Sequence, residues 1–312
     1  MKIMITGGFG FVGSHLTEEL LAEKHQLIIL TKGYSKKSNL SSVINKINIE
    51  KIDVTNLVKF GECIKKYKPN VIIHLAGQTS HSKSFDDPIN DVASNTASTL
   101  VILETIRKLN LKCRFMLGST FIVVGKPKKL PVNELTPCNP TTIYGVNRLS
   151  SEYYCKIYHD VYGLDTIVFR ITNAYGPREQ NVPNKNAINY LIYKAYNGEE
   201  ITLFNKGKTS RDLIYVADVV SAIIRIMKKG KTGELYWISS NQKISLRKFG
   251  ELLEKLTGTK VRYVDAPSYT KKVDVGDFVV DNKKLQSLGW KPTTPIQKGI
   301  QKTMNHFKSL NL

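Results

Sequence analysis

Residues 2–13 read Lys-Ile-Met-Ile-Thr-Gly-Gly-Phe-Gly-Phe-Val-Gly, an apolar segment that runs directly into a glycine-rich turn. Residues 2–6 have the character of a short buried β-strand, and residues 13–24 repeat leucines at helical spacing. A strand, a glycine-rich turn and a helix in this order are typical of the start of a dinucleotide-binding fold. This stretch therefore predicts both the fold class and the first ligand site.

The glycines of the turn fit two spacings, G-x-G-x-x-G through Gly8, Gly10 and Gly13, and G-x-x-G-x-x-G beginning at Gly7. Glycine lets the backbone turn tightly and approach a pyrophosphate, while the helix start offers free N–H groups and the positive end of its dipole. We expect the backbone of the turn and of the helix start to hold the pyrophosphate of a dinucleotide: Gly7, Gly10, Phe11, Val12 and Gly13.

The rest of the first half alternates strands and helices. Apolar runs predict strands at 26–31, 48–54, 71–76, 114–119 and 165–172, and amphipathic runs predict helices at 56–67, 91–109 and 144–162. Apolar strands separated by amphipathic helices are typical of a parallel sheet covered on both faces. The expected fold class is α/β, a Rossmann-type doubly wound parallel sheet with a smaller C-terminal α/β substrate-binding domain.

The alternation loosens after about Asn173, where loops become longer and richer in proline, asparagine and lysine. Short strands are predicted at 201–204, 235–239 and 261–264, and helices at 188–196, 216–227 and 246–256. We therefore expect residues 1–172 with 208–242 to form the dinucleotide-binding domain. Residues 173–207 with 243–312 are expected to form the substrate-binding domain.

The chain has 312 residues, of which 41% are hydrophobic and 23% charged, so it can bury a core. No apolar run reaches the roughly 18 residues that a membrane span needs. The 46 Lys and Arg against 26 Asp and Glu give a net charge of +20, which favours nucleic acid, an anionic membrane or phosphorylated small molecules as partners. Because the lysines are dispersed, we interpret most of the excess as solvated surface.

The end of the second predicted strand reads Leu-Thr-Lys-Gly, at residues 30–33. Sites for NAD usually carry an acidic residue there, which bonds the ribose hydroxyls. This chain has Thr31 and Lys32 instead, with Lys36 close behind. A lysine could meet the 2′-phosphate of NADP, although such a loop is often only solvated surface. The sequence favours NADP over NAD without excluding NAD.

Three further residues suggest chemistry beside the dinucleotide. Thr120 directly follows the fifth predicted strand, and Tyr144 and Arg148 stand four residues apart, on one face of a helix. A tyrosine can give or take the proton of a sugar hydroxyl, and a nearby cation stabilises its phenolate and lowers its pKa. Thr120 would orient the same oxygen. We predict that these three are catalytic and that Tyr144 and Arg148 also contact the dinucleotide.

At this point the chain resembles the extended short-chain dehydrogenase/reductases that act on nucleotide sugars, the NAD-dependent epimerase/dehydratase group. The matches run in order along almost the whole sequence: 6–13 (TGxxGxxG), 52–54, 74–77 (HLAA or HLAG), Asn95, 119–125 (SSxxVYG), Tyr144 (YxxxK), 170–178 (R-x-x-N-x-YGPR), 211–219 (RDFIYVDDV) and 288–290 (LGW).

The resemblance implies two sets of ligand contacts. Besides the glycine loop, those to the cofactor are Thr31, Lys32, Asp53, Val54, Leu75, Ala76, Gly77, Asn95, Tyr144 and Arg148. The expected contacts to a nucleotide-diphosphate sugar are Thr120, Asn173, Arg211 and Lys271. Gln78, Ser80 and His81 are expected to line the sugar pocket as well, because they follow the fourth strand at the sheet edge where ligands bind. His81 could equally be a bystander, Asn173 a turn residue, and Arg211 a surface ion-pair partner of Asp212.

Two departures from the family pattern bear on the reaction. The YxxxK lysine is Arg148, which keeps the charge but is bulkier, so it either substitutes for lysine or weakens the site. Thr120 is followed by Phe121 and Ile122, where 4,6-dehydratases carry Asp-Glu and UDP-glucuronate decarboxylases a Glu. An apolar pair cannot move a proton at C5 or eliminate water. The sequence therefore argues against both reactions.

The leading hypothesis is a nucleotide-sugar epimerase that oxidises C4 transiently to a 4-keto sugar and reduces it again. The alternative is an NADPH-dependent ketoreductase of a 4-keto-6-deoxy sugar nucleotide, which the basic end of the second strand favours. A third reading is a non-catalytic dinucleotide-binding protein that contacts RNA or another protein. Such a protein would show a contiguous basic stripe with aromatic platforms, which this sequence lacks.

The remaining expectations concern compartment and assembly. The four cysteines are far apart and form no CxxC, so we predict reduced thiols and no metal site. The N-terminus runs directly into the first motif, which predicts no signal peptide and a cytoplasmic protein without membrane attachment. The helices at 91–109 and 144–162 are where relatives build a dimer interface, so we expect a homodimer, although the same residues could pack on the sheet.

Overall fold

The structure is a computed structural model that describes residues 1–33, 37–183, 185–267 and 273–310. It divides into two compact units. Unit 1 comprises Met1–Thr120, Thr142–Arg170 and Val220–Tyr236, and unit 2 comprises Phe121–Thr141, Ile171–Val219 and Trp237–Leu312. Residues 121–141 and 208–219 thus cluster with unit 2. The domain bounds expected from the sequence stay a prediction.

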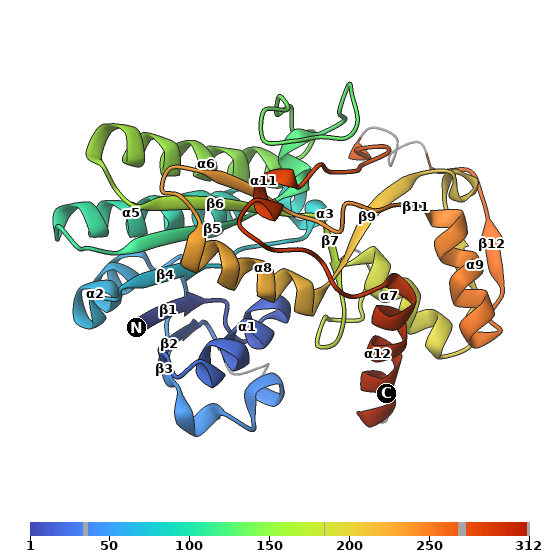
Figure 1. The fold of residues 1–312 in the computed structure, drawn as a ribbon, viewed down its shortest axis with the longest axis horizontal. Coiled ribbons are helices and arrows are strands. Elements are labelled where there is room, and N and C mark those ends of the chain that lie inside the picture. The colour runs from blue at the N-terminus through green and yellow to red at the C-terminus, as the bar shows by residue number, and fades with distance from the viewer. Residues whose placement is uncertain (34–36, 184, 268–272, 311–312) are drawn as a thin grey trace. The chain divides into compact units, whose positions relative to one another are not determined.

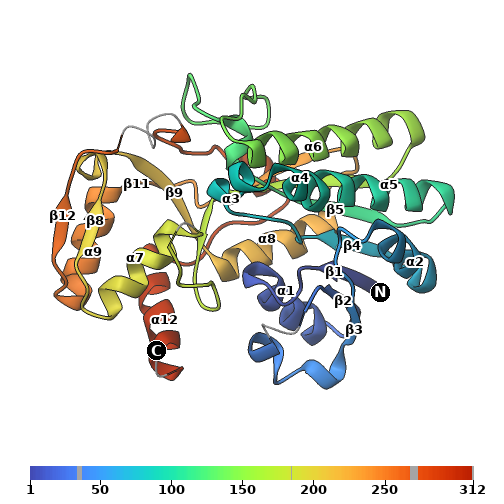
Figure 2. The same ribbon diagram turned by 180° about the vertical axis from the view of Figure 1, so that it is seen from behind.

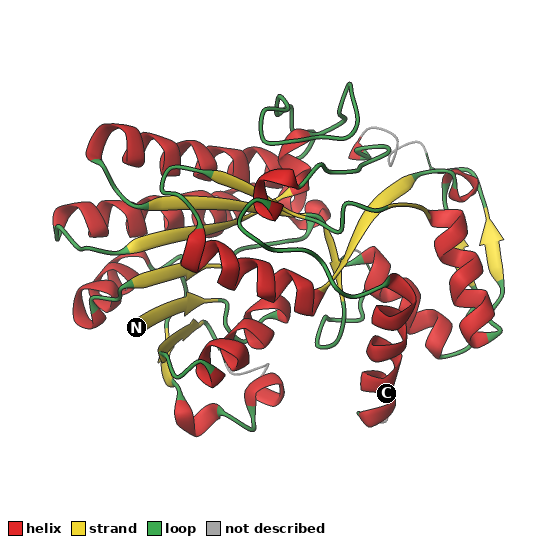
Figure 3. Ribbon diagram, viewed as in Figure 1, coloured by secondary structure: helices red, strands yellow, loops and turns green. Residues whose placement is uncertain are grey.

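A seven-stranded sheet forms the centre of the first unit, in the order β10-β6-β5-β4-β1-β2-β3 (Figures 1 and 3). The pairs β3–β2, β2–β1, β1–β4 and β4–β5 are parallel. With helices on both faces, this order confirms the predicted doubly wound Rossmann-type fold. The strand bounds are β1 (Lys2–Thr6), β2 (Gln26–Thr31), β3 (Asn48–Lys51), β4 (Val71–His74), β5 (Arg114–Thr120), β6 (Thr166–Ile171) and β10 (Leu235–Ile238).

Helices α2 (Leu57–Tyr67), α5 (Ser98–Lys108) and α6 (Ile143–Tyr162) pack side by side on one face of the sheet (Figure 2). Helices α1 (Phe11–Ala22) and α8 (Val216–Lys229) lie on the other face, where Lys228 Nζ and Glu23 Oε1 are 2.7 Å apart. Helix α6 begins where Thr142 Oγ1 accepts the Gly145 N–H, and it ends at Gly163 in the left-handed conformation.

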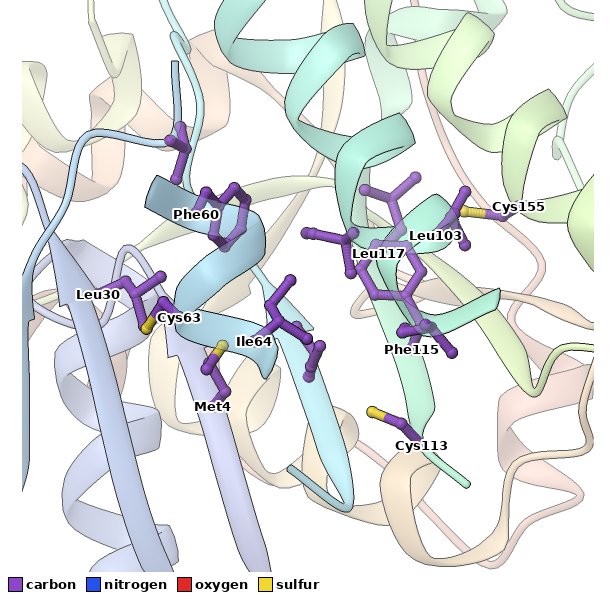
Figure 4. Close-up of a cluster of buried hydrophobic side chains, with 14 of the residues drawn as sticks. Met4, Leu30, Phe60, Cys63, Ile64, Leu103, Cys113, Phe115, Leu117 and Cys155 are labelled. Carbon is purple, nitrogen blue, oxygen red and sulfur yellow. The ribbon is translucent and has the colours of Figure 1, made fainter. Parts of the chain in front are cut away.

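One hydrophobic core cluster of unit 1 lies between the sheet and this α2–α5–α6 layer. Strand and helix side chains meet there, with Phe60, Ile64, Leu103, Phe115 and Leu117 completely buried (Figure 4). Apolar burial of this kind contributes about 25 cal/mol per Å² of area removed from water. The core thereby fixes the carboxyl ends of β1, β4 and β5, from which the candidate site is built.

The helix expected at 91–109 is not continuous. Helix α4 (Pro88–Asp91) leads into a π-helical segment, η3 (Val92–Ala97), before α5 begins. π-helical turns are rare and often occur at functional sites. The wider turn places Asp91 and Asn95 in the interior of unit 1, where both are fully buried. A short helix that the sequence did not predict, α3 (His81–Asp86), precedes α4.

Unit 2 contains two small sheets, ordered β11-β9-β7 and β12-β8. Their strands are β7 (Asn173–Tyr175), β8 (Ile201–Leu203), β9 (Ser210–Tyr215), β11 (Lys243–Ser245) and β12 (Val261–Tyr263). Helices α7 (Ala187–Tyr196), α9 (Leu246–Thr257) and α12 (Ile296–Ser309) also belong to this unit. Strands β7, β9 and β11 and helix α12 were not predicted. No helix in the described ranges is long and apolar enough to cross a membrane.

Candidate dinucleotide and catalytic site

The glycine loop leaves its backbone open at the N-terminus of α1. Gly7 has a φ of 73°, and a Cβ there would lie 2.9 Å from the backbone nitrogen of Ala76. A Cβ on Gly13 would collide with the carbonyl oxygen of Gly7, so the loop can close only without side chains at these positions. The Gly10 N–H donates to that same carbonyl, at 2.8 Å.

The start of α1 fits a diphosphate. Its N-cap, Gly10, offers no side-chain hydrogen bond, and its first turn contains no acidic residue. The first N–H groups of a helix have no partner within the helix, and the dipole there favours an anion. The backbone of Phe11, Val12 and Gly13 can therefore hold the negative charge that the sequence predicted for this position.

The other predicted cofactor residues of unit 1 follow the ends of β2 and β3. The Thr31 hydroxyl donates to the carbonyl of Gly33, at 2.6 Å, and the Lys32 side chain is exposed. Asp53 is half-buried, and its Oδ1 accepts the backbone N–H and the hydroxyl of Thr55. Lys36 lies outside the described residues.

A buried chain of hydrogen bonds sets the backbone after β4. The pKa of His74 is lowered to about 3 by burial and by the charge of Arg148, so its imidazole is neutral. The Ser98 hydroxyl donates to Ser94 O at 2.7 Å, so His74 Nε2 donates to Ser98 and Nδ1 accepts from Thr6 Oγ1, at 2.7 Å. Thr6 Oγ1 in turn accepts the Ala76 N–H at 3.1 Å. This chain fixes residues 75–77 at the edge of the glycine loop.

Thr120, Tyr144 and Arg148 come together in unit 1, and all three side chains are buried. Burial raises the pKa of Tyr144, whereas the Arg148 charge and a hydrogen bond with Thr120 lower it, and the Asp91 charge raises it. A phenol between a cation and a hydroxyl donor is suited to exchange a proton with a substrate hydroxyl.

Arg148 is held loosely by the described part of unit 1. Its Nη1 donates to Asn95 Oδ1 over 3.4 Å, and its buried Nε has no hydrogen-bond partner among the described residues. A buried guanidinium with unused donors fits a site that a ligand completes, because buried cations require partners. This observation supports the predicted contact between Arg148 and the cofactor.

Residues that follow β4 lie beside Tyr144. The imidazole of His81 stacks on the Tyr144 ring, with 5.6 Å between ring centroids and 26° between planes. Burial lowers the pKa of His81 and so favours its neutral form. Gln78 Oε1 accepts the Ser80 N–H, while its Nε2 donates to Ser80 O and to Asp91 Oδ2. Gln78 and Ser80 therefore shape the loop, and their contact with a substrate stays a prediction.

The predicted residues of unit 2 form contacts of their own. Asn173 Nδ2 donates to the carbonyl of Asp212 at 3.2 Å. Arg211 Nη2 lies 2.8 Å from Asp274 Oδ1, and its Nη1 donates to the carbonyls of Ser210 and Gly276. The acidic partner of Arg211 is thus Asp274 and not its neighbour Asp212. Lys271 lies outside the described residues.

The profile of the "NAD dependent epimerase/dehydratase family" matches residues 3–239 of the chain. The chain belongs to this family. A putative UDP-glucose 4-epimerase of Methanocaldococcus jannaschii is 29% identical, and the alignment covers 99% of each chain. A UDP-glucose 4-epimerase of Thermotoga maritima, solved with UDP-glucose, superposes with a TM-score of 0.92 at 28% identity and covers 100% of both chains. One of Thermus thermophilus, solved with NAD, gives 0.88 at 25% identity and covers 99% of both.

Within this epimerase/dehydratase chain, three buried polar groups around the site escaped sequence reasoning. They are the His74 hydrogen-bond chain, the carboxylate of Asp91 and an ion pair between Glu152 and Arg170. The one local signal was the carboxylate of Glu152, one turn after Arg148 on the same side of the helix α6. Their partners lie too far away in sequence to be read from spacing.

Proposed function

We propose that this protein is a nucleotide-sugar 4-epimerase that oxidises C4 to a ketone and reduces it again from the other face. The observation that carries the proposal is the buried set of Thr120, Tyr144 and Arg148, in the same unit as the glycine loop. The 4-epimerases similar to this chain over their full length add support.

The roles of the three residues follow from their surroundings. A nicotinamide dinucleotide, when bound, supplies the hydride acceptor and donor. Tyr144 takes the proton of the C4 hydroxyl and returns it when the hydroxyl re-forms. Arg148 stabilises the phenolate by its charge, and Thr120 stabilises it through their hydrogen bond. The buried setting strengthens both effects, because the effective dielectric is low there.

Epimerisation at C4 needs no further proton-transfer group, which agrees with the residues after Thr120. Phe121 and Ile122 have no titratable atoms, and Ile122 is buried. Elimination of water across C5 and C6 needs an acid and a base there. We therefore place dehydration and decarboxylation below epimerisation.

The proposed cofactor is NADP or NAD. The exposed side chain of Lys32 and the lack of a carboxylate at the end of β2 favour the 2′-phosphate of NADP. The Thermus thermophilus epimerase, by contrast, was solved with NAD. We propose that Lys32→Asp lowers the affinity for NADP⁺ relative to NAD⁺, measured by titration calorimetry. An unchanged ratio would remove Lys32 from the cofactor site.

The second candidate, favoured by the same basic strand end, is an NADPH-dependent 4-ketoreductase. The two functions differ in how they use the dinucleotide. An epimerase regenerates it in every cycle and is expected to retain it through purification. A reductase consumes NADPH in proportion to the substrate reduced. Two measurements distinguish them: the dinucleotide released when the purified protein is denatured, and the loss of absorbance at 340 nm from added NADPH when substrate is supplied.

The proposed substrate is a nucleotide-diphosphate sugar, and its proposed contacts in unit 1 are Gln78, Ser80 and His81. Asn173 and Arg211, in unit 2, stay contacts predicted from the sequence. His81 supports this assignment best, since its ring stacks directly on Tyr144. His81→Phe, which keeps a stacking ring but removes the ring nitrogens, is expected to raise KM for the sugar nucleotide more than it lowers kcat. A KM equal to that of the wild type would make His81 a packing residue only.

We also propose a homodimer in a reducing, cytoplasmic compartment. Helix α6 exposes an apolar stripe in which Tyr153 is 58% exposed, Ile157 48% and Val161 65%, a surface that suits a helix-to-helix contact. All four cysteines are free thiols. Sedimentation that shows only a 35.2 kDa species at micromolar concentration would refute the dimer.

A further inference from the structure

A fully buried carboxylate close to Arg148 is satisfied by amides alone. Asp91 Oδ1 accepts hydrogen bonds from Asn95 Nδ2 at 3.1 Å and from Asn147 Nδ2 at 2.7 Å, and its Oδ2 accepts one from Gln78 Nε2 at 2.9 Å. In the described part of the chain, no lysine or arginine lies within ion-pair distance of this carboxylate. A buried anion of this kind is costly unless a positive charge nearby offsets it.

Arg148 is a buried cation with few hydrogen-bond partners among the described residues. Its side chain is only 5% exposed, and its one hydrogen bond to the described residues runs from Nη1 to Asn95 Oδ1. Asn95 therefore bridges a buried anion and a buried cation, with the carboxylate of Asp91 at its Nδ2 end and the guanidinium at its Oδ1 end.

The orientation of this bridge is determined by its other bonds. Asn95 Nδ2 donates to Asp91 Oδ1 and also to the carbonyl of Gln78, at 3.0 Å. A flipped amide would turn its oxygen towards two acceptors and its NH₂ group towards the guanidinium. Both contacts would be unfavourable, so the carboxylate and the carbonyl together direct Oδ1 to Arg148.

We propose that Asp91 is a positioning residue for Arg148 and acts through the amide of Asn95. Asp91 touches neither substrate nor cofactor in this account. It holds the acceptor that orients the guanidinium, and its negative charge offsets the buried cation. The proposal rests on the function proposed above only in giving Arg148 a place in the dinucleotide and catalytic site.

The contact between Asn95 and Arg148 also requires glycine at residue 77. A Cβ at this position would collide with Asn95 Oδ1 and would lie 3.4 Å from Arg148 Nη1. Asn95 cannot retreat without giving up its bonds to Asp91 and Gln78. The missing side chain at residue 77 is therefore a condition for the contact between Asn95 and Arg148.

A double-mutant cycle on Asp91→Asn and Arg148→Met tests the proposal, read out by affinity for NAD⁺ and NADP⁺ and by urea unfolding. Asp91→Asn preserves shape and removes the charge; it also replaces one acceptor oxygen by an NH₂ group, a change that is the same in both backgrounds. It is expected to weaken dinucleotide binding about tenfold when Arg148 is present and less than about twofold when Met replaces it, a coupling typical of linked residues. It should lower the melting temperature more in the wild type than in Arg148→Met, because only the wild type also loses the charge that offsets the buried guanidinium. Equal effects in both backgrounds would overturn the proposal.

Gly77→Ala is a second probe that changes no charge, in case Asp91→Asn fails to fold. It should reproduce the loss of dinucleotide affinity in the wild type and have little effect in Asn95→Ala, where the obstructed oxygen is gone. A matched control is Thr96→Val, which removes the nearby hydroxyl bond to the Asn147 carbonyl and should leave affinity unchanged. An equal loss from Gly77→Ala in both backgrounds would contradict the role of Asn95.

None of these measurements requires sugar turnover. If the coupling is found in a protein without epimerase activity, the positioning role stands and the proposed reaction fails. If epimerase activity is found without the coupling, only the role of Asp91 fails.

Discussion

Glu152 and Arg170 form a buried ion pair directly behind the candidate site. Arg170 Nη2 lies 2.6 Å from Glu152 Oε2, the two side chains are 5% and 7% exposed, and Ser119 Oγ donates to the same carboxylate. Glu152 follows Arg148 by one turn of α6, and Ser119 precedes Thr120 in β5. The pair therefore ties β5, β6 and α6 together at the positions that carry the catalytic residues.

Glu152→Gln should destabilise the protein strongly, because it removes the charge that Glu152 places against the buried guanidinium of Arg170. Removal of one partner of a buried pair typically costs about 3–5 kcal/mol. Chemical denaturation measures the loss directly. Asp160→Asn, which breaks the exposed pair between Lys156 and Asp160 in the same helix, is the matched control and should change little. Similar effects of the two variants would show that the buried pair has no special structural role.

Arg148→Lys is expected to retain activity, and Arg148→Met to lose it by at least about a hundredfold, a typical contribution of one electrostatic or acid–base group. Lysine keeps the charge that lowers the pKa of Tyr144, whereas methionine removes it and leaves a similar volume. The test is the steady-state kcat/KM of both variants, with dinucleotide affinity measured in parallel. It shows whether activity depends on the positive charge at residue 148. Equal rates would exclude Arg148 as the functional counterpart of the family's lysine.

Thr120→Val should move the pH dependence of kcat/KM to higher pH. Proton removal from the substrate hydroxyl needs the Tyr144 phenolate, so the rate rises with pH as that form appears. The hydrogen bond with Thr120 lowers the pKa of Tyr144, and its loss raises that pKa. Ser150→Ala, which removes a hydroxyl bond to Val146 on the exposed side of α6, is the control and should leave the profile in place. An unmoved profile in Thr120→Val would count against the assigned hydrogen bond.

We predict that the titration of Asp212, in unit 2, makes the unfolding free energy depend on pH. Burial raises its pKa from 3.8 to about 6, against the hydrogen bonds that it accepts from Ser240, Val280 and Thr172. The folded state then binds more protons than the unfolded state between these values. The unfolding free energy contributed by Asp212 should therefore fall as pH rises through this window, by up to about 3 kcal/mol.

The difference in unfolding free energy between wild type and Asp212→Asn isolates this effect from other groups. Glu104, whose pKa is lowered to about 2 by its hydrogen bond with Arg107, contributes equally to both proteins. Urea unfolding should show that the unfolding free energy of the wild type, relative to that of the variant, is lower at pH 7 than at pH 4. A difference independent of pH would mean that the folded-state pKa of Asp212 is close to its ordinary value.

Much of unit 1 could be predicted because its signals are local. Strands β1 and β2 have the bounds read from their apolar runs, and the glycine loop sits between β1 and α1 as expected. Thr120, Tyr144 and Arg148 were found because a strand end and a four-residue spacing on a helix bring them together. Local patterns of this kind survive folding when the tertiary structure agrees with them.

The features that could not be predicted depend on contacts between residues that are distant in sequence. The break in the predicted helix could not be read from the sequence, because Asp91, just before the π-helical segment, bonds to Gln78 and Asn147, which lie elsewhere in unit 1. Strands β7, β9 and β11 are short and pair with segments far away in sequence. They are too short for an alternation of apolar and polar residues to predict them. The partner of Arg211, Asp274, lies 63 residues further on.

The central claim is C4 epimerisation, and the fate of a label at C4 tests it most directly. Purified protein would be incubated with UDP-sugars and dTDP-sugars that carry deuterium at C4, without added reductant, and followed by NMR. We predict formation of the C4 epimer with deuterium still on C4, because the hydrogen leaves and returns through the bound dinucleotide. Conversion that requires stoichiometric NADPH, or an epimer that has lost its C4 deuterium to solvent, would contradict it.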